Sequence, residues 1–197
     1  MNPIWPCAAD ISWSWRVADL YVPLTDGDIA LEPLAEAHRE GLRAACAEDN
    51  DIWQIYPFSY AGDAFDPQFD RMLAGPPQRC CYAVTIDGAV VGMTAWIDDN
   101  PAFQSVEIGN SYIVPRLRGS GFNTRLKKLM IDHVVARGYR RIVFKVDQVN
   151  ARSQAAVLKQ GCTQEGVLRA ERITWTGRVR DTVIFSILAD EWKALQA

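Results

Sequence analysis

Gly119, Ser120 and Gly121 stand at a point of the chain where an anion could be bound. An apolar run that predicts a strand precedes them, and apolar residues at spacings of three and four predict a helix after them. The first N–H groups of a helix lack internal partners, and the helix dipole favours negative charge there. Five basic residues crowd the same stretch, which contains no acid: Arg116, Arg118, Arg125, Lys127 and Lys128. We interpret the stretch as a diphosphate-binding loop.

The spacing of the glycines separates three kinds of phosphate loop. A nucleoside-triphosphate loop requires Gly-x-x-x-x-Gly-Lys-Ser/Thr, and a dinucleotide loop requires a third glycine where Thr124 stands. The pattern Arg/Gln-x-x-Gly-x-Gly/Ala fits from Arg118 to Gly121, with Asn123 at its last position. It resembles the coenzyme A pyrophosphate loop of the GNAT superfamily of N-acetyltransferases. The alternative is a glycine turn ahead of a basic, solvated helix.

The resemblance extends over residues 28–193 and is closest to the RimJ/RimL-type branch, whose members acetylate protein N-termini. The matching strings follow the family's order: LEPL at 31–34, VEIG at 106–109, residues 119–127, NARS at 150–153, GCTQEGVL at 161–168 and RVRDTVIFSIL at 178–188. Asparagine occurs at the position of Asn123 in the relatives that the chain most resembles, and its amide could donate to a phosphate.

The resemblance implies acetyl-CoA as co-substrate and no metal. Backbone groups of Ile113 and Val114 would pair with the pantetheine arm as an added strand does. Asn150 would hold the pantetheine amide or the start of a helix. The implied coenzyme-binding residues are Ile113, Val114, Arg118, Gly119, Ser120, Gly121, Phe122, Asn123, Thr124, Asn150 and Ser153.

The implied reaction transfers an acyl group from a thioester to an amine. It needs a neutral amine, a polarised carbonyl and a proton for the leaving thiolate. Glu107 is the candidate base, because the family often carries an acid there that deprotonates the amine through water. Ser153 is the candidate acid, although a serine hydroxyl is a poor acid unless it relays a proton. Structural alternatives stay open for both: Glu107 could tie loops together, and Ser153 could be an ordinary residue of a helical turn.

Residues 48–62 form a predicted loop rich in acids and aromatic rings. In the GNAT pattern this region lines the acceptor groove, so the resemblance implies Trp53, Tyr56, Phe58 and Glu107 as substrate-binding residues. Ring faces and carboxylates suit an amine. The alternative is that Trp53 and Phe58 pack under the loop.

Charge is divided unevenly along the chain. Residues 1–100 carry 16 acids and 5 arginines, whereas residues 101–197 carry 8 acids and 16 basic residues. A basic half suits coenzyme A, and an acidic half suits a cationic amine substrate. Nucleic-acid binding ranks lower, because the basic residues concentrate at a phosphate loop.

Periodicity predicts an α+β domain with the strands 29–34, 80–86, 89–97, 105–114, 141–146, 163–175 and 178–188. These would form a mixed, mostly antiparallel sheet of about seven strands. Helices are predicted at 35–47, 66–74, 120–137, 150–160 and 190–196. The unit 105–146 requires a parallel pair with a crossover helix. The resemblance implies that this central pair splays apart and admits pantetheine.

At 197 residues, one domain is expected: a GNAT domain at 28–197, with residues 1–27 as an extended arm packed on it. No apolar run is long enough to span a membrane, and no secretory signal is recognisable. Five cysteines without a Cys-x-x-Cys pair argue against a disulfide framework or a zinc site. A cytoplasmic protein is expected.

Together these inferences predict an acetyl-CoA-dependent N-acetyltransferase acting on a primary amine, with a protein N-terminal α-amine among its acceptors. No nucleic-acid or membrane partner is expected, and a homodimer is left open. Two alternatives remain: a small-molecule acceptor such as an antibiotic, polyamine or amino acid, and a non-catalytic acyl-CoA-binding regulator.

Overall fold

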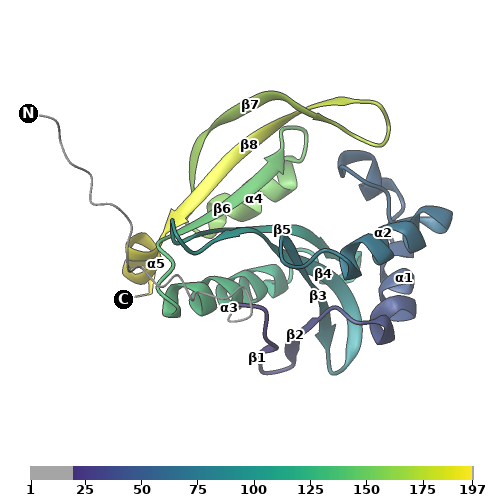
Figure 1. Cartoon of the computed structure of the whole chain (residues 1–197), viewed down its shortest axis with the longest axis horizontal. Helices are drawn as coiled ribbons and strands as arrows, with labels where there is room; N and C mark the ends of the chain where they lie inside the picture. The colour runs from purple at the N-terminus through teal and green to yellow at the C-terminus, as the bar shows by residue number, and fades with distance from the viewer. Residues whose placement is uncertain (1–19, 197) are drawn as a thin grey trace, which may run out of the picture.

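The computed structural model describes residues 20–196, which build one eight-stranded sheet (Figure 1). The strand order is β1-β2-β3-β4-β5-β6-β8-β7, and among these described strands only β5 and β6 pair in parallel. The strands are Leu24–Asp26 (β1), Ile29–Pro33 (β2), Arg79–Ile86 (β3), Ala89–Asn100 (β4), Ser105–Ile113 (β5), Arg141–Asp147 (β6), Thr163–Ile173 (β7) and Val179–Leu188 (β8).

Helices flank the sheet at both ends. Figure 1 shows α3 running along the sheet with α5 at its C-terminal end, and α1 and α2 together at the opposite end of the molecule. The α-helices are Arg39–Ala47 (α1), Phe65–Leu73 (α2), Phe122–Ala136 (α3), Ala151–Lys159 (α4) and Ala189–Leu195 (α5). Short 3-10 segments lie at Glu36–His38 (η2), Asp51–Ile55 (η3), Gly62–Ala64 (η4) and Pro115–Leu117 (η5). None of the helices within residues 20–196 is long and apolar enough to cross a bilayer.

The predicted α+β fold is confirmed, with one more strand than expected. The extra strand, β1, comes from the arm predicted at 1–27; residues 1–19 of that arm lie outside the described residues. Three residues are too few to show a strand period in the sequence. Leu20 is buried, and its carbonyl accepts hydrogen bonds from Tyr82 at 2.9 Å and Trp96 at 3.2 Å. Residues 20–26 are therefore packed onto the sheet.

The central parallel pair splays apart, as expected. β5 and β6 are paired only from Ser105 opposite Arg141 to Glu107 opposite Val143. Beyond these three positions each strand stays paired with its other neighbour, β5 with β4 and β6 with β8. Because each is held along its outer edge, the gap between them is part of the fold.

A bulge in β5 bends the strand beside this gap. Asn110 and Ser111 of β5 lie opposite a single residue of β4, Thr94. Asn110 has a φ of 49°, in the left-handed region that asparagine tolerates better than most residues. Bulges bend a strand and re-aim its side chains, and this one directs β5 away from β6.

Candidate active site

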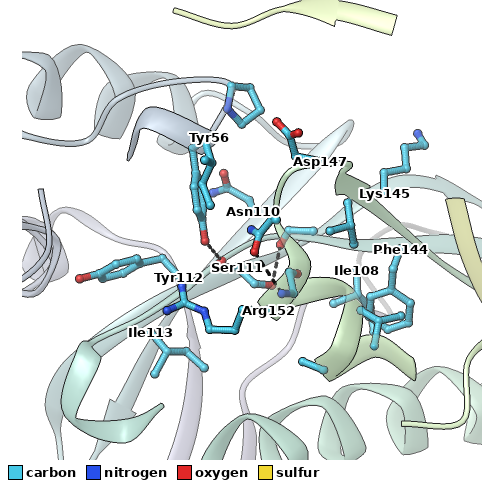
Figure 2. Close-up of a pocket in the computed structure, with 18 of the residues that line it drawn as sticks. Tyr56, Ile108, Asn110, Ser111, Tyr112, Ile113, Phe144, Lys145, Asp147 and Arg152 are labelled. Atoms are coloured by element: carbon cyan, nitrogen blue, oxygen red, sulfur yellow. Dashed lines mark hydrogen bonds between the residues drawn. The ribbon is translucent and has the colours of Figure 1, made fainter. Parts of the chain in front are cut away.

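A cavity of about 400 Å³ occupies the gap between β5 and β6 (Figure 2). Figure 2 shows Asn110 and Ser111 on the β5 side, and Lys145 and Asp147 on the β6 side. The glycine loop, the segment after η3 and the β7–β8 hairpin also contribute to the lining. One cavity thus connects the predicted coenzyme loop with the predicted acceptor region.

The glycine loop leaves room for a ligand over its backbone. Gly119 and Gly121 have φ values of 79° and 88°, and no atom lies within 4 Å of the place where either Cβ would stand. Gly121 directly precedes α3, whose first N–H groups lack helical partners. Nε of Arg118 donates to the Ile113 carbonyl at 3.0 Å, while its Nη2 is buried and has no hydrogen-bond partner within residues 20–196. Open glycines at a helix N-terminus and an unsatisfied guanidinium N–H fit a diphosphate.

Part of the predicted coenzyme-binding set lines the cavity, namely Ile113, Arg118, Gly119, Asn123, Asn150 and Ser153. Other members shape the loop from behind. The Ser120 hydroxyl donates to the Leu117 carbonyl at 2.8 Å and accepts from the Phe122 amide at 3.3 Å. The Phe122 ring is buried in the core, and the Thr124 amide donates to the Gly121 carbonyl at 3.0 Å. The Ser120 hydroxyl, the Phe122 ring and the Thr124 amide therefore hold the turn, and these three residues do not line the cavity.

Val114 does not fit the strand-like pairing expected for it. Its N–H donates to the Val91 carbonyl at 3.0 Å, and its carbonyl accepts from Leu117 at 3.2 Å. The turn η5 begins directly after Val114 and draws the chain away from the line of β5. Ile113 remains beside the cavity.

The basic residues around the loop are largely paired with acids from the first hundred residues. The pairs are Arg116–Glu48, Arg118–Asp49 and Arg125–Asp28. The acids of α2 likewise pair with arginines of α1, since Asp66 accepts from Arg39 at 2.9 Å and from Arg43 at 2.7 Å. Acids of the first hundred residues therefore pair both with basic residues near the loop and with arginines of their own half, and the attraction of a cationic substrate to this half stays a prediction.

Lys127 reaches from α3 to the bulge in β5. Its Nζ lies 2.6 Å from Ser111 Oγ and 3.1 Å from Thr94 Oγ1, and the residue is 6% exposed. The Tyr56 hydroxyl donates to the carbonyl of the same Ser111 (Figure 2). Burial lowers the pKa of Lys127 to about 7.

Glu107 stands at the last paired position of β5, where the gap opens. Its side chain is buried at the cavity wall, and its Oε2 lies 2.7 Å from Nζ of Lys145 on β6. Burial raises the pKa of Glu107 above its ordinary value, and the nearby ammonium opposes only part of that shift. Lys145 also pairs with Asp98 at 3.2 Å. Glu107 is thus a proton-accepting group in the cavity that is already tied to one cation.

A third carboxylate, Asp147, ends β6 beside the cavity. Its side chain is 2% exposed, and it pairs with Arg178 and, at 3.7 Å, with Arg180. Arg180 also lines the cavity. The cavity carboxylates Asp98, Glu107 and Asp147 therefore all have cationic partners.

The predicted acceptor residues divide into two groups. Tyr56 and Phe58 line the cavity, as does Glu107. Trp53 does not: it is 0% exposed, and its Nε1 donates to the Cys46 carbonyl at 3.2 Å. Its ring packs on Tyr112, with centroids 4.7 Å apart. The placement of Trp53 in the groove is therefore corrected, because η3 turns its indole inward under the loop.

The β7–β8 hairpin reaches across to η3 and the segment after it. The Trp175 amide donates to the Pro57 carbonyl at 3.1 Å, and the Trp175 indole donates to the Trp53 carbonyl at 2.8 Å. These bonds join regions more than a hundred residues apart. The hairpin and this segment consequently wall the same part of the cavity.

Asn150 and Ser153 stand at the start of α4. Asn150 Oδ1 accepts from the Ser153 amide at 3.0 Å, which makes Asn150 the N-cap of the helix. Both side chains also line the cavity. The capping bond uses the Asn150 oxygen, so its amide nitrogen is available to a ligand.

Comparison with protein families matches residues 28–163 to the acetyltransferase (GNAT) domain. The chain belongs to the GNAT acetyltransferase family. A GCN5-related N-acetyltransferase from Brucella melitensis is 28% identical, with a TM-score of 0.82 over 88% of this chain and 81% of that chain. A Chromobacterium violaceum structure assigned to the GNAT family is 28% identical, with a TM-score of 0.80 over 88% and 94%. A search of curated protein sequences finds no match.

More distant GNAT structures differ in the acceptors that their names give. RimL, a ribosomal-protein N-acetyltransferase in complex with coenzyme A, is 16% identical over 86% of this chain and 99% of that chain, with a TM-score of 0.74. A spermidine N-acetyltransferase from Vibrio cholerae with coenzyme A and spermine is 17% identical over 85% and 99%, with a TM-score of 0.68. Identities this low show the fold alone, so neither neighbour decides the acceptor.

As a GNAT acetyltransferase, the protein uses acetyl-CoA as its co-substrate and transfers the acetyl group to an amine. Its cavity offers an anion cradle at one wall, and buried carboxylates and aromatic rings at others. Within residues 20–196, no group of three or more His, Cys, Asp and Glu side chains could hold a metal ion.

Lys127 and Ser111 are among the cavity residues to which the sequence analysis gave no individual role. Lys127 appeared only as one of five basic residues near the loop. Its spacing of three and four from Met130 and Ile131, both buried, was the available signal that it faces inward. For Ser111 there was no comparable signal, because a bulge depends on the pairing of two strands.

Proposed function

We propose that the protein acetylates the α-amine of a peptide or protein N-terminus, as the RimJ/RimL-type branch does, rather than a polyamine. The observation that carries this proposal is the pairing of the cavity carboxylates. Lys145 pairs with Glu107 and Asp98, and arginines hold Asp147. A polyamine needs unpaired carboxylates for the ammonium groups that do not react, and none of these three supplies one.

The arginines of the cavity also favour a peptide N-terminus over a polyamine as the acceptor. Arg79, Arg152 and Arg172 also line it. Like charges brought together in an interface are costly, so these arginines disfavour an acceptor with several ammonium groups. A peptide N-terminus brings a single amine, followed by neutral amides.

The acidity of the amine also favours an α-amine. A free α-amine has a pKa of about 8, whereas a lysine amine has a pKa of about 10.4. The α-amine therefore loses its proton with less help. Glu107, whose carboxylate already pairs with Lys145, is therefore better suited to deprotonating an α-amine than a lysine amine.

Each group then has a role. The glycine loop and Arg118 bind the diphosphate, and Tyr56 and Phe58 contact the acceptor. Glu107 accepts the amine proton through a water molecule, and Ser153 lies beside the thiol. We also place the protein in the reducing cytoplasm, which suits its free, buried cysteines: Cys46, Cys80, Cys81 and Cys162.

Thiol release from acetyl-CoA across an acceptor panel tests the proposal. The panel pairs each free peptide with its N-formyl counterpart and adds spermidine, single amino acids and an α-blocked lysine. We expect release with free peptides, none with blocked peptides, and weak release with spermidine. Acetylation of spermidine or amino acids without any peptide would contradict the proposed acceptor. Coenzyme binding without release on any amine would favour the non-catalytic regulator.

A further inference from the structure

Lys127 is a buried amine to which the proposed reaction has so far given no role. It is 6% exposed and lines the cavity. No carboxylate within residues 20–196 forms an ion pair with it, whereas the adjacent Lys128 pairs with Asp132 at 2.7 Å. An ammonium removed from water without a counter-ion is costly to a fold. We therefore expect the buried amine of Lys127 to have a chemical function that offsets its cost to stability.

Two hydroxyls hold the amine of Lys127. Ser111 Oγ lies 2.6 Å and Thr94 Oγ1 lies 3.1 Å from Nζ, and the two hydroxyl oxygens are 2.9 Å apart. A hydroxyl can accept a hydrogen bond from an ammonium and donate its own proton onward. Ser111 lines the cavity, and its hydroxyl donates to the Gly109 carbonyl at 3.2 Å. Rotation of this hydroxyl toward a ligand would let it pass on a proton from Lys127.

The bulge is also the place where the thioester is expected. With the diphosphate at Gly119 and Gly121, the coenzyme arm enters the gap beside Ile113 and continues along β5. The next cavity-lining residues in that direction are Tyr112, Ser111 and Asn110. The sulfur of the coenzyme thus comes to lie near the bulge.

We propose that Lys127 is the proton source for the leaving thiolate of coenzyme A, with the hydroxyl of Ser111 as the relay. The inference rests on the proposed acetyl transfer. When the tetrahedral intermediate collapses, the C–S bond breaks and its electron pair goes to sulfur. Sulfur takes the Ser111 proton, Ser111 takes a proton from the Lys127 ammonium, and Lys127 becomes neutral. The acceptor ammonium gives its first proton to Glu107, and this proton leaves to solvent. The nitrogen of the intermediate gives up a second proton, which restores the Lys127 ammonium, so ammonium and thioester become amide, thiol and one released proton.

The acidity of Lys127 suits this step. Burial brings its pKa to about 7, below the value of about 8.5 for a free thiol, so the transfer to a thiolate is downhill. A serine hydroxyl alone, such as that of Ser153, is a far weaker acid.

Other charged and titratable groups share the cavity with Lys127, and they define the expected pH profile. They are Tyr56 and Tyr60 from η3 and the segment after it, Arg79 from β3, Asp98 from β4, Glu107 and Tyr112 from β5, Arg118 from the loop, Lys145 and Asp147 from β6, Arg152 from α4, Arg172 from β7 and Arg180 from β8. Arginines keep their charge throughout, and burial raises the pKa of Tyr56. The pKa of Lys145 is also raised, because Glu107 and Asp98 outweigh the effect of burial. Lys127 is therefore the group expected to govern the alkaline limb near neutrality, and Glu107 governs the acid limb.

The pH dependence of kcat tests the proposal, with peptide and acetyl-CoA both saturating. Wild-type kcat should fall above about pH 7 as Lys127 loses its proton. Lys127→Met should lower kcat by about 100-fold, the order of a lost proton transfer, and should lack this alkaline limb. Lys127→Arg keeps the charge but cannot release a proton, so it should not rescue kcat. The matched control Lys128→Met should behave as wild type. Calorimetry should show nearly unchanged affinity for coenzyme A in all variants.

A ¹³C NMR titration of the lysine side chains provides a readout that is independent of activity. We expect a resonance that titrates near pH 7 in the wild type and is missing in Lys127→Met. Titration of Lys127 near pH 10, or an alkaline limb that persists in Lys127→Met, would overturn the proposal. If the wild type acetylates no peptide, the proposed acceptor fails, and Lys127 is judged by the NMR titration and by kcat on whichever amine is accepted.

Discussion

Burial and a neighbouring cation act in opposite directions on the carboxylate of Glu107. Its buried position favours the neutral acid, and Nζ of Lys145 at 2.7 Å favours the charged form. The raised pKa makes Glu107 a stronger base than a solvated glutamate.

We expect Glu107→Gln to lower kcat by about 100-fold, the order of general base catalysis, with little change in coenzyme affinity. The loss should be greatest at low pH, where the amine depends most on a base. Thiol release measured as a function of pH checks this. Asp98→Asn is the matched control, since it removes the exposed carboxylate that pairs with the same Lys145. Equal losses of kcat in Glu107→Gln and Asp98→Asn would show that the rate depends on the ion pairs of Lys145 and not on proton transfer to Glu107.

Substitution of Trp53 should change the stability of the fold, whereas substitution of Phe58 should change the binding of the acceptor. Trp53→Phe removes a buried hydrogen bond to the Cys46 carbonyl, which should cost about 1–3 kcal/mol of unfolding free energy. It should leave the acceptor KM unchanged. Phe58→Leu should raise the acceptor KM with little loss of stability, because Phe58 lines the cavity. Urea unfolding and steady-state kinetics check the pair. A raised acceptor KM in Trp53→Phe but not in Phe58→Leu would show that Trp53, and not Phe58, contacts the acceptor.

At the scale of elements, the turn before α3 and the turn between β7 and β8 form a natural comparison. Gly121 and Gly177 have φ values of 88° and 81°, and at neither would a Cβ meet an atom within 4 Å. Alanine at either position should therefore cost about 1–2 kcal/mol of backbone strain. Only Gly121 stands at the start of a helix facing the proposed diphosphate site.

We expect Gly121→Ala to weaken coenzyme A binding at least about tenfold, which corresponds to 1.4 kcal/mol, and Gly177→Ala to leave it unchanged. Calorimetric titration of both variants checks this, with thermal unfolding to compare their strain. Equal affinities in the two variants would place the diphosphate somewhere other than the glycine loop.

The gap between β5 and β6 is also a property of elements. Gly92 of β4 still pairs with Ile113, and Thr182 of β8 still pairs with Asp147, at the far ends of the two strands. Each strand is thus held on its outer side while the inner edges part. The gap proposed to admit the coenzyme is therefore preformed, and binding there need not separate paired strands.

At the scale of the whole molecule, His133 joins the start of the described chain to α3. Its Nε2 donates to the Leu20 carbonyl at 3.2 Å, and its ring stacks on Trp96. Nδ1 accepts from Arg137 at 2.8 Å, which requires a neutral ring. Burial lowers the pKa of His133 to about 4.

This histidine should make the fold sensitive to acid. Between pH 6.5 and 4 the unfolded chain binds a proton at this residue and the folded chain does not. The free energy of unfolding therefore falls as the pH drops through that window. His133→Gln should remove about 1–3 kcal/mol of that loss, since one pKa unit corresponds to 1.36 kcal/mol. Urea unfolding at a series of pH values checks this, with His38→Gln as the control for losing a histidine elsewhere. The same pH dependence in wild type and His133→Gln would contradict the assignment.

Local spacing accounts for what could be predicted from the sequence. The glycine loop, the order of the elements and the start of α4 at Asn150 were all recognisable, because each depends on residues a few positions apart. Helix and strand periods also show which residues share a face. The splay of the central strands came from resemblance to the family and not from any period in the sequence.

What lies opposite a given face was decided only by the tertiary structure. The sequence did not show that Arg118 would meet Asp49, 69 residues away, or that Arg125 would meet Asp28, 97 residues away. It also did not show that Trp53 turns inward while Phe58 lines the cavity, or that Lys127 is buried with no carboxylate partner among residues 20–196. A charge or a ring gains its role from the groups packed against it, and those groups come together only when distant segments fold onto one another.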